Sequence, residues 1–180
     1  GKKCCALRRK KERKYMSTKK NPTSGLILDV FGPVVEFLTM PEDEHNDFCV
    51  MKGELPPGGV IPLHSHGDTE DFIVLSGEIE ALRQDTQGYE WIKAKTGDYI
   101  HIPGNSQHAW RNVSSKPAVL HIIVTNKMGQ FFQEIGRPVS NPPKPVTPDD
   151  LSHFEAVSVR YNYWNATPEE NAAVGINFSF

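Results

Sequence analysis

Turn-forming residues divide residues 25–126 into short segments, and this punctuation is the strongest constraint on the fold. The segments between the turns are rich in β-branched and aromatic residues, whereas Gly, Pro, Asn and Asp gather at the breaks. Many short strands at regular spacing predict an all-β sandwich or barrel. The expected strands span residues 26–30, 34–39, 47–55, 60–66, 71–76, 78–84, 89–94, 99–102, 106–112 and 118–125.

One of these segments carries three potential metal ligands. His64 and His66 are two residues apart, so on a strand their imidazoles point to the same face. Glu70 follows a short turn and can return a carboxylate to that face. Two imidazoles and one carboxylate bind Fe, Mn, Zn, Ni or Cu and leave coordination positions open. The alternative interpretation is a group of polar residues on a solvated turn.

A second polar cluster follows at residues 97–112, and the two clusters together resemble the paired motifs of the cupin family. The first motif, G-x5-H-x-H-x3,4-E-x6-G, is matched by Gly58, His64, His66, Glu70 and Gly77. The second, G-x5-P-x-G-x2-H-x3-N, is matched by Gly97, Pro103, His108 and Asn112. Asn105 stands where the family usually has glycine. Asn tolerates the left-handed backbone conformation better than most residues.

The resemblance implies a fold and a metal site. The fold would be a double-stranded β-helix, the jelly-roll barrel of the cupins, over residues 21–127. One divalent transition ion (Fe, Mn, Ni, Zn or Cu) would be bound by His64, His66, Glu70 and His108, with Glu70 also the candidate catalytic residue. Residues 128–180 would form a helical extension that packs on the barrel, because Thr147-Pro148 and Thr167-Pro168 are helix-start patterns.

Several other polar or aromatic residues near the motifs allow two interpretations. Trp110 shares strand parity with His108, so it is either a wall for a substrate ring or a core residue. His121 lies among apolar residues and is either a substrate contact or a satisfied core histidine. Asp68 and Asp71 flank Glu70 and are either solvated turn charges or rim groups of the site, of which we favour the solvated turn charges.

Charge distribution and cysteine content indicate the nature of the N-terminal segment, the expected partners and the cellular location. Ten of the twenty Lys and Arg residues lie in residues 1–20, with Glu12 the only acid there. Such a block is usually disordered, and we interpret residues 1–20 as a basic arm or leader. We expect no nucleic-acid partner and no membrane partner. The cysteines show no disulfide framework, so we expect a cytoplasmic protein.

The resemblance leaves the function open between two classes. The first is a mononuclear metal enzyme, a dioxygenase similar to quercetinase, acting on a small chelating organic substrate. The second is a sugar or small-acid isomerase, or a binding module without catalysis, because fold does not fix function. We expect a homodimer, formed through terminal segments that contain Leu26, Ile27, Phe178 and Phe180.

Overall fold

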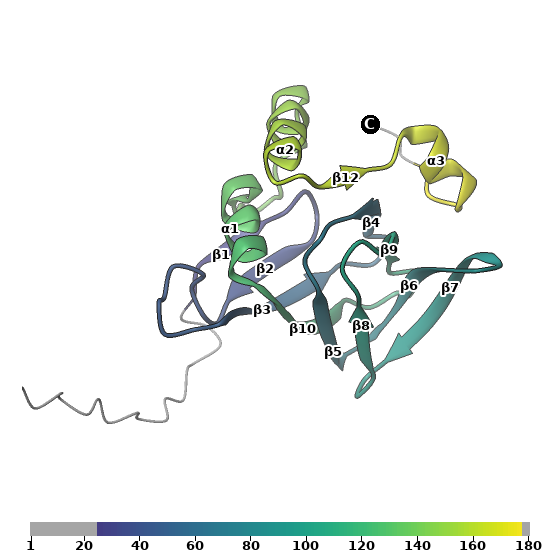
Figure 1. Ribbon diagram of the computed structural model, residues 1–180, viewed down its shortest axis with the longest axis horizontal. Helices are drawn as coiled ribbons and strands as arrows, with labels where there is room; N and C mark the ends of the chain where they lie inside the picture. Colours follow the sequence, from purple (N-terminus) through teal and green to yellow (C-terminus); the bar gives the residue numbers. More distant parts are fainter. Residues whose placement is uncertain (1–24, 178–180) are drawn as a thin grey trace, which may run out of the picture.

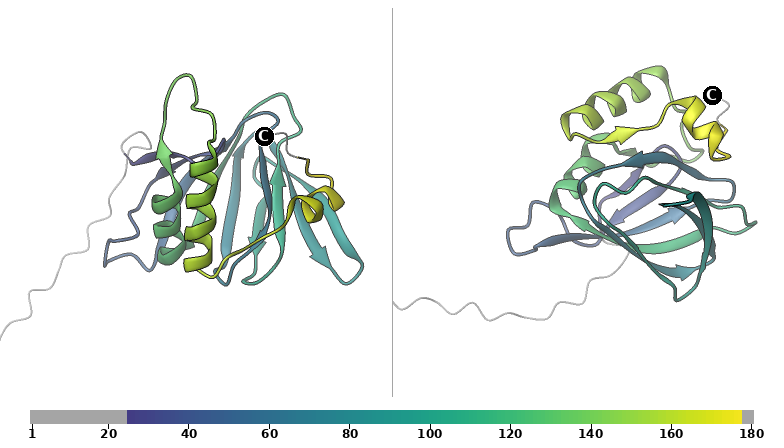
Figure 2. Two further views of the ribbon diagram at one scale, coloured as in Figure 1. Left: turned by 90° about the horizontal axis from the view of Figure 1, so that it is seen from above. Right: turned by 45° about the vertical axis from the view of Figure 1, so that its right-hand side comes forward.

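The computed structural model describes residues 25–177 as a barrel of two facing antiparallel sheets with a C-terminal extension on one side (Figure 1). The predicted basic arm at residues 1–20, Phe178 and Phe180 lie outside the described residues. The right-hand view of Figure 2 shows the sheets enclosing a common interior. The prediction of an all-β jelly-roll barrel with short C-terminal helices is therefore confirmed.

The two sheets are built from segments far apart in the sequence. The larger sheet has the order β11-β1-β2-β3-β10-β5-β8, and the smaller has the order β12-β4-β9-β6-β7. The strands are β1 (Ile27–Asp29), β2 (Val34–Phe37), β3 (Phe48–Leu55), β4 (Val60–Ser65), β5 (Glu70–Ser76), β6 (Glu78–Asp85), β7 (Gly88–Lys95), β8 (Tyr99–Ile102), β9 (His108–Arg111), β10 (Ala118–Thr125), β11 (Arg137–Pro138) and β12 (Trp164–Asn165).

The barrel interior is apolar away from the ligand residues of the motifs. Alternate residues of both sheets point inward, as expected for strands with one buried face. Phe72 and Trp110 meet there with ring centroids 4.4 Å apart. The buried members of this interior cluster are Leu55, Phe72, Val74, Ile79, Ala81, Ala94, Ile102, Trp110, Ala118 and Leu120.

The described residues contain three helices, and two of them begin at the helix-start patterns of the sequence. The three helices are α1 (Asn126–Ile135), α2 (Pro148–Arg160) and α3 (Pro168–Ala173). Thr147 and Thr167 cap α2 and α3, each in a capping box with the acidic residue three positions later. Helices α1 and α2 lie side by side, as the left-hand view of Figure 2 shows.

The extension is more than the helical layer that the sequence predicts, because it also adds a strand to each sheet. β11 pairs with β1, and β12 pairs with β4. The contact with β4 is reinforced by Asn171, whose Oδ1 accepts a hydrogen bond from the Leu63 N–H at 2.9 Å. Two-residue strands carry little hydrophobic pattern, so the sequence gives no indication of them.

β1 is partly covered on its outer edge by β11. It lies between β2 and β11, with Leu28 opposite both Val35 and Pro138. β11 does not lie opposite Leu26 or Ile27, so the predicted dimer contact through these two residues stays a prediction. Within residues 25–177, no helix is long and apolar enough to cross a membrane.

Candidate metal centre

A β-bulge in β4 turns His64 toward the barrel interior. Ile61 lies opposite Trp110, and His64 lies opposite His108. Between these two pairs, β4 contains one more residue than β9. An extra residue of this kind bends a strand and redirects its side chains. Pro62 lies within the bulge, where proline is tolerated. His66 follows two residues after His64 and faces the same way, as the spacing predicts.

The four motif residues converge from both sheets. His64, His66 and His108 come from β4, its end and β9 in the smaller sheet, whereas Glu70 opens β5 in the larger sheet. One ligand atom from each residue lies within 4.8 Å of the other three. His66, Glu70 and His108 are buried, and His64 is partly exposed. The site therefore lies between the sheets, with His64 on its more open side.

Backbone carbonyls fix the orientation of all three imidazoles. Nδ1 of His64 lies 2.7 Å from the Pro62 carbonyl oxygen, Nδ1 of His66 lies 2.9 Å from that of Asp68, and Nδ1 of His108 lies 2.8 Å from that of Ser106. A carbonyl oxygen only accepts, so each Nδ1 must carry the proton. The Nε2 atom of each ring is then the one that is free to bind a cation.

The resulting arrangement fits a divalent transition ion. His108 Nε2 and His66 Nε2 lie 3.1 Å and 3.5 Å from Glu70 Oε2. The buried His66 Nε2 has no hydrogen-bond partner of normal geometry. With Nδ1 protonated, lone pairs of the imidazoles face a buried carboxylate, which is unfavourable unless a cation or proton lies between them. The Nε2 atoms and the Glu70 carboxylate are therefore the groups that would hold the metal.

Without a metal, a proton takes the place of the cation. Burial alone would raise the pKa of Glu70, but the neighbouring imidazoles of His108 and His66 hold that pKa well below its usual range. Burial would lower the pKa of His66, but the Glu70 carboxylate raises it above its ordinary value of 6.5. Burial and the neighbouring His108 lower the pKa of His64 to about 3. The metal-free site therefore favours a protonated His66 beside an ionised Glu70.

Metal affinity should rise with pH for this reason. Below its raised pKa, His66 must release one proton before Nε2 can bind a metal, so the logarithm of the affinity should rise by about one per pH unit and then level off. The same proton stabilises the metal-free fold below pH 6.5, and that stabilisation is lost as pH rises through the folded pKa. Co(II) titrations of the metal-free protein between about pH 6 and 8 test the slope. A flat profile would contradict it.

The two predicted substrate-binding residues lie on opposite faces of the barrel wall: Trp110 points into the interior, and His121 points outward. Trp110 is only 2% exposed and packs in the barrel interior against Phe72. His121 lies on β10 opposite Lys52 and Ile73, and it alternates with the inward-facing Leu120. His121 therefore points to the outer face of the larger sheet and does not join the site.

The two acids beside Glu70, predicted to be solvated turn charges, differ in their burial and in their hydrogen-bond partners. Asp68 is 9% exposed, and its carboxylate accepts hydrogen bonds from the hydroxyls of Thr125 and Tyr163. That prediction is wrong for Asp68. Asp71 lies on the outer face, where it accepts a hydrogen bond from Tyr99 at 2.6 Å and contacts His101 Nδ1 at 2.7 Å.

The second motif forms the turns around His108. Asn105 has a φ of 65°, which confirms that this residue takes the left-handed conformation. Gly104 packs against Gly67, where an added Cβ would lie 2.4 Å from the Gly67 carbonyl oxygen. Asn112 is buried and donates hydrogen bonds to the carbonyls of Leu55 and Lys116. These residues shape the loops around His108, the candidate ligand of this motif.

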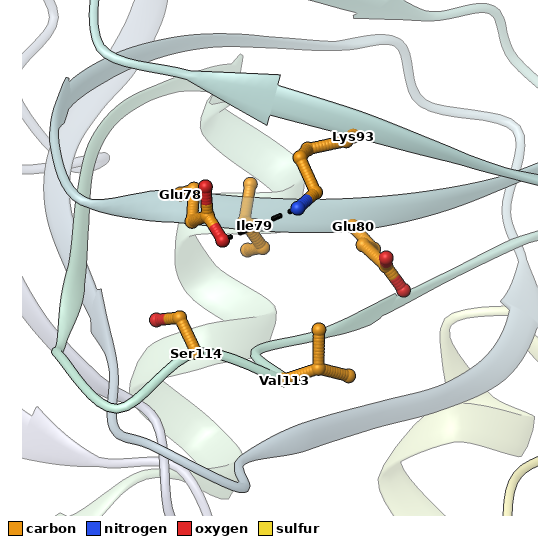
Figure 3. A pocket seen from close by; sticks show the side chains of 6 residues that line it. All are labelled: Glu78, Ile79, Glu80, Lys93, Val113 and Ser114. Atoms are coloured by element: carbon orange, nitrogen blue, oxygen red, sulfur yellow. Dashed lines mark hydrogen bonds and ion pairs between the residues drawn. The ribbon is translucent and has the colours of Figure 1, made fainter.

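A small depression elsewhere on the barrel is not a second site. Figure 3 shows its lining, in which Lys93 Nζ lies 3.3 Å from Glu78 Oε1. Val113 and Ser114 complete one side of it, and it has no room for a water-sized ligand. None of the four motif ligands contributes to it.

Known proteins share this fold and part of this sequence. Residues 51–124 match the cupin domain family. Quercetin 2,3-dioxygenase of Bacillus subtilis (strain 168) is 31% identical over 105 residues, which cover 58% of this chain and 30% of that protein. The chain thus spans less than a third of that relative.

Two solved structures support the fold alone. The polyketide cyclase RemF from Streptomyces resistomycificus gives a TM-score of 0.56 at 17% identity, covering 79% of this chain and 99% of that chain. The plu4264 protein from Photorhabdus luminescens gives a TM-score of 0.50 at 22% identity, covering 64% and 92%. The fold and the His₃Glu cluster define a jelly-roll protein with a site that could hold a metal. Within this jelly roll, residues 51–124 form a cupin domain.

Proposed function

We propose that this protein is a mononuclear metal-dependent dioxygenase that acts on a small organic substrate able to chelate the metal through two adjacent oxygens. The observation that carries the proposal is the convergence of His64, His66, Glu70 and His108, each of which offers one ligand atom within 4.8 Å of the others. The similarity to a quercetin 2,3-dioxygenase supports the reaction class. A divalent transition ion held by four protein donors supplies Lewis acidity and open positions for O₂ or substrate oxygens.

The residues of the chain would divide the work as follows. The three carbonyl-anchored imidazoles keep their Nε2 atoms directed at one point. Glu70 supplies one negative charge, so a divalent ion keeps a net positive charge. Glu70 Oε2 is also the carboxylate oxygen nearest to two ligands, and it is the candidate position for holding a substrate proton. The substrate would approach from the side of His64, the most exposed of the four.

Oxygen uptake tests the reaction. The metal-free protein is reconstituted separately with Fe(II), Mn(II), Ni(II) and Zn(II) and mixed with catechols, flavonols and 1,3-diketones. We expect O₂ uptake with at least one redox-active metal, no uptake with redox-inert Zn(II), and loss of uptake in Glu70→Gln. If no form consumes O₂, but a sugar or small acid raises the melting temperature, the isomerase or binding-module interpretation replaces the dioxygenase.

The homodimer remains a prediction. β1 is paired on both sides, so the outermost longer strands are β7 and β8. We expect light scattering at micromolar concentration to give a mass of about twice 20.2 kDa. A mass of one chain would contradict the dimer.

A cytoplasmic location is also a proposal. Cys49 is fully buried next to Gly129, and burial raises the pKa of its thiol to about 11. A thiol of this kind is inert as a nucleophile and packs as a small apolar residue. Cys49 is a free thiol, and the described residues 25–177 contain no disulfide. Free thiols of this kind support the proposed cytoplasmic location.

A further inference from the structure

A buried carboxylate connects the metal centre to the C-terminal extension. Asp68 lies between His66 and Glu70, and its backbone carbonyl is the oxygen that fixes His66 Nδ1. Its side chain accepts a hydrogen bond from Thr125, the N-cap residue of α1, and one of 2.7 Å from the hydroxyl of Tyr163. Lys127 Nζ is the nearby cation, 4.0 Å from Asp68 Oδ2. Asp68 therefore fixes a ligand with its backbone while the extension holds its side chain.

Tyr163 reaches the same ligand by a second route. Its ring packs on the imidazole of His66, with centroids 5.2 Å apart and planes inclined by 52°. The Tyr163 ring also contacts the ring of Phe131 of α1, with centroids 4.7 Å apart. Tyr163 thus contacts His66 through its ring and holds the Asp68 carboxylate through its hydroxyl.

The backbone around Tyr163 holds it in this place. α2 ends just before it, Asn162 takes a left-handed φ of 60°, and the Tyr163 N–H donates to the Ser158 carbonyl at 2.8 Å. The next two residues form β12, which pairs directly with the ligand strand: Trp164 lies opposite Ser65, and Asn165 lies opposite His64. The position of Tyr163 is therefore set by contacts on both sides along the chain.

We propose that Tyr163 is a positioning residue of the metal centre, acting on His66 through the Asp68 carboxylate and through its own ring. The proposal rests on the proposed metal binding, and it goes beyond it by assigning a role to the extension, which lies outside the matched cupin domain. Partners of this kind orient metal-binding imidazoles, and their loss typically lowers metal affinity by about 10–100-fold. Tyr163 is not a ligand.

The test compares two tyrosines that lose the same group. Tyr163→Phe removes the hydroxyl that binds Asp68, and Tyr161→Phe removes a hydroxyl that donates to Glu134 Oε1 at 2.6 Å, away from the ligands. Co(II) is the probe, because its visible absorption reports ligand geometry as well as binding. We expect Tyr163→Phe to weaken Co(II) binding about tenfold and to alter the spectrum. Tyr161→Phe should keep both at wild-type values, although it also loses a hydrogen bond.

A double-mutant cycle tests the route through Asp68. Asp68→Asn keeps the backbone carbonyl that His66 uses and weakens only the carboxylate acceptor. If Tyr163 acts through this carboxylate, the losses of Co(II) affinity in Tyr163→Phe and Asp68→Asn will not add in the double variant. Additive losses would overturn the route, and wild-type affinity and spectrum in Tyr163→Phe would overturn the positioning role. If the wild-type protein itself binds no Co(II), metal binding fails first and the inference falls with it.

Discussion

The double substitution His64→Ala/His108→Ala should abolish metal binding. It removes two of the four candidate ligands, one from each of the neighbouring strands β4 and β9. Two remaining donors cannot hold a divalent transition ion in competition with water. The loss should therefore exceed the roughly 10–100-fold that follows removal of an outer hydrogen-bond partner. Elemental analysis of protein purified without chelator should give about one metal per wild-type chain and none in the variant.

The matched control removes two other histidines. His101 and His121 lie on the outer face of the larger sheet, so His101→Ala/His121→Ala should keep the full metal content. Removing His108 also takes a hydrogen-bond partner from the buried Glu70 carboxylate, which can destabilise the fold. His64→Ala alone leaves that contact intact and should still weaken binding. A double variant that retains metal as well as the wild type would disprove the ligand set.

The second large effect should come from the barrel interior. Trp110→Ala should lower the free energy of unfolding by about 3–5 kcal/mol, because it empties a closely packed position next to Phe72. Urea denaturation should show an earlier midpoint with little change in slope. The folded variant should still bind one metal per chain, since Trp110 contributes no ligand atom.

A second tryptophan provides the comparison. Trp91 is partly exposed and donates from its indole N–H to the Val174 carbonyl, so Trp91→Ala should cost less than Trp110→Ala. If Trp110→Ala leaves stability nearly unchanged but abolishes binding of an aromatic substrate, Trp110 is a substrate wall rather than a core residue. That result would support the first interpretation from the sequence, in which Trp110 forms a wall for a substrate ring.

The strands and the clustering of the four candidate ligands could be predicted well, because both depend on local spacing. Each of the ten expected strands of the barrel is present, with ends that differ by a few residues. The shared face of His64 and His66 follows from a two-residue period, which tolerates small errors in strand ends. The starts of α2 and α3 follow from Thr-Pro pairs and the acids after them.

Features that depend on distant parts of the chain could not be predicted in the same way. The bulge in β4 is visible only against its partner β9, although Pro62 inside a strand was an available indication. Glu70 approaches from the opposite sheet, which a turn of three residues does not reveal. Asp68 reads as a turn charge because its partners, Thr125 and Tyr163, are 57 and 95 residues away.

The pairing of β12 with β4 has a consequence for the order in which the protein folds during synthesis. The barrel strands have all left the ribosome once residue 125 has emerged, and local hairpins such as β6–β7 can form before then. The edge of β4 still lacks its neighbour, and Leu63 still lacks Asn171, 108 residues further on. The strand that carries His64 is therefore among the last to be completed. A nascent chain that stops after the cupin domain would expose this edge to other chains.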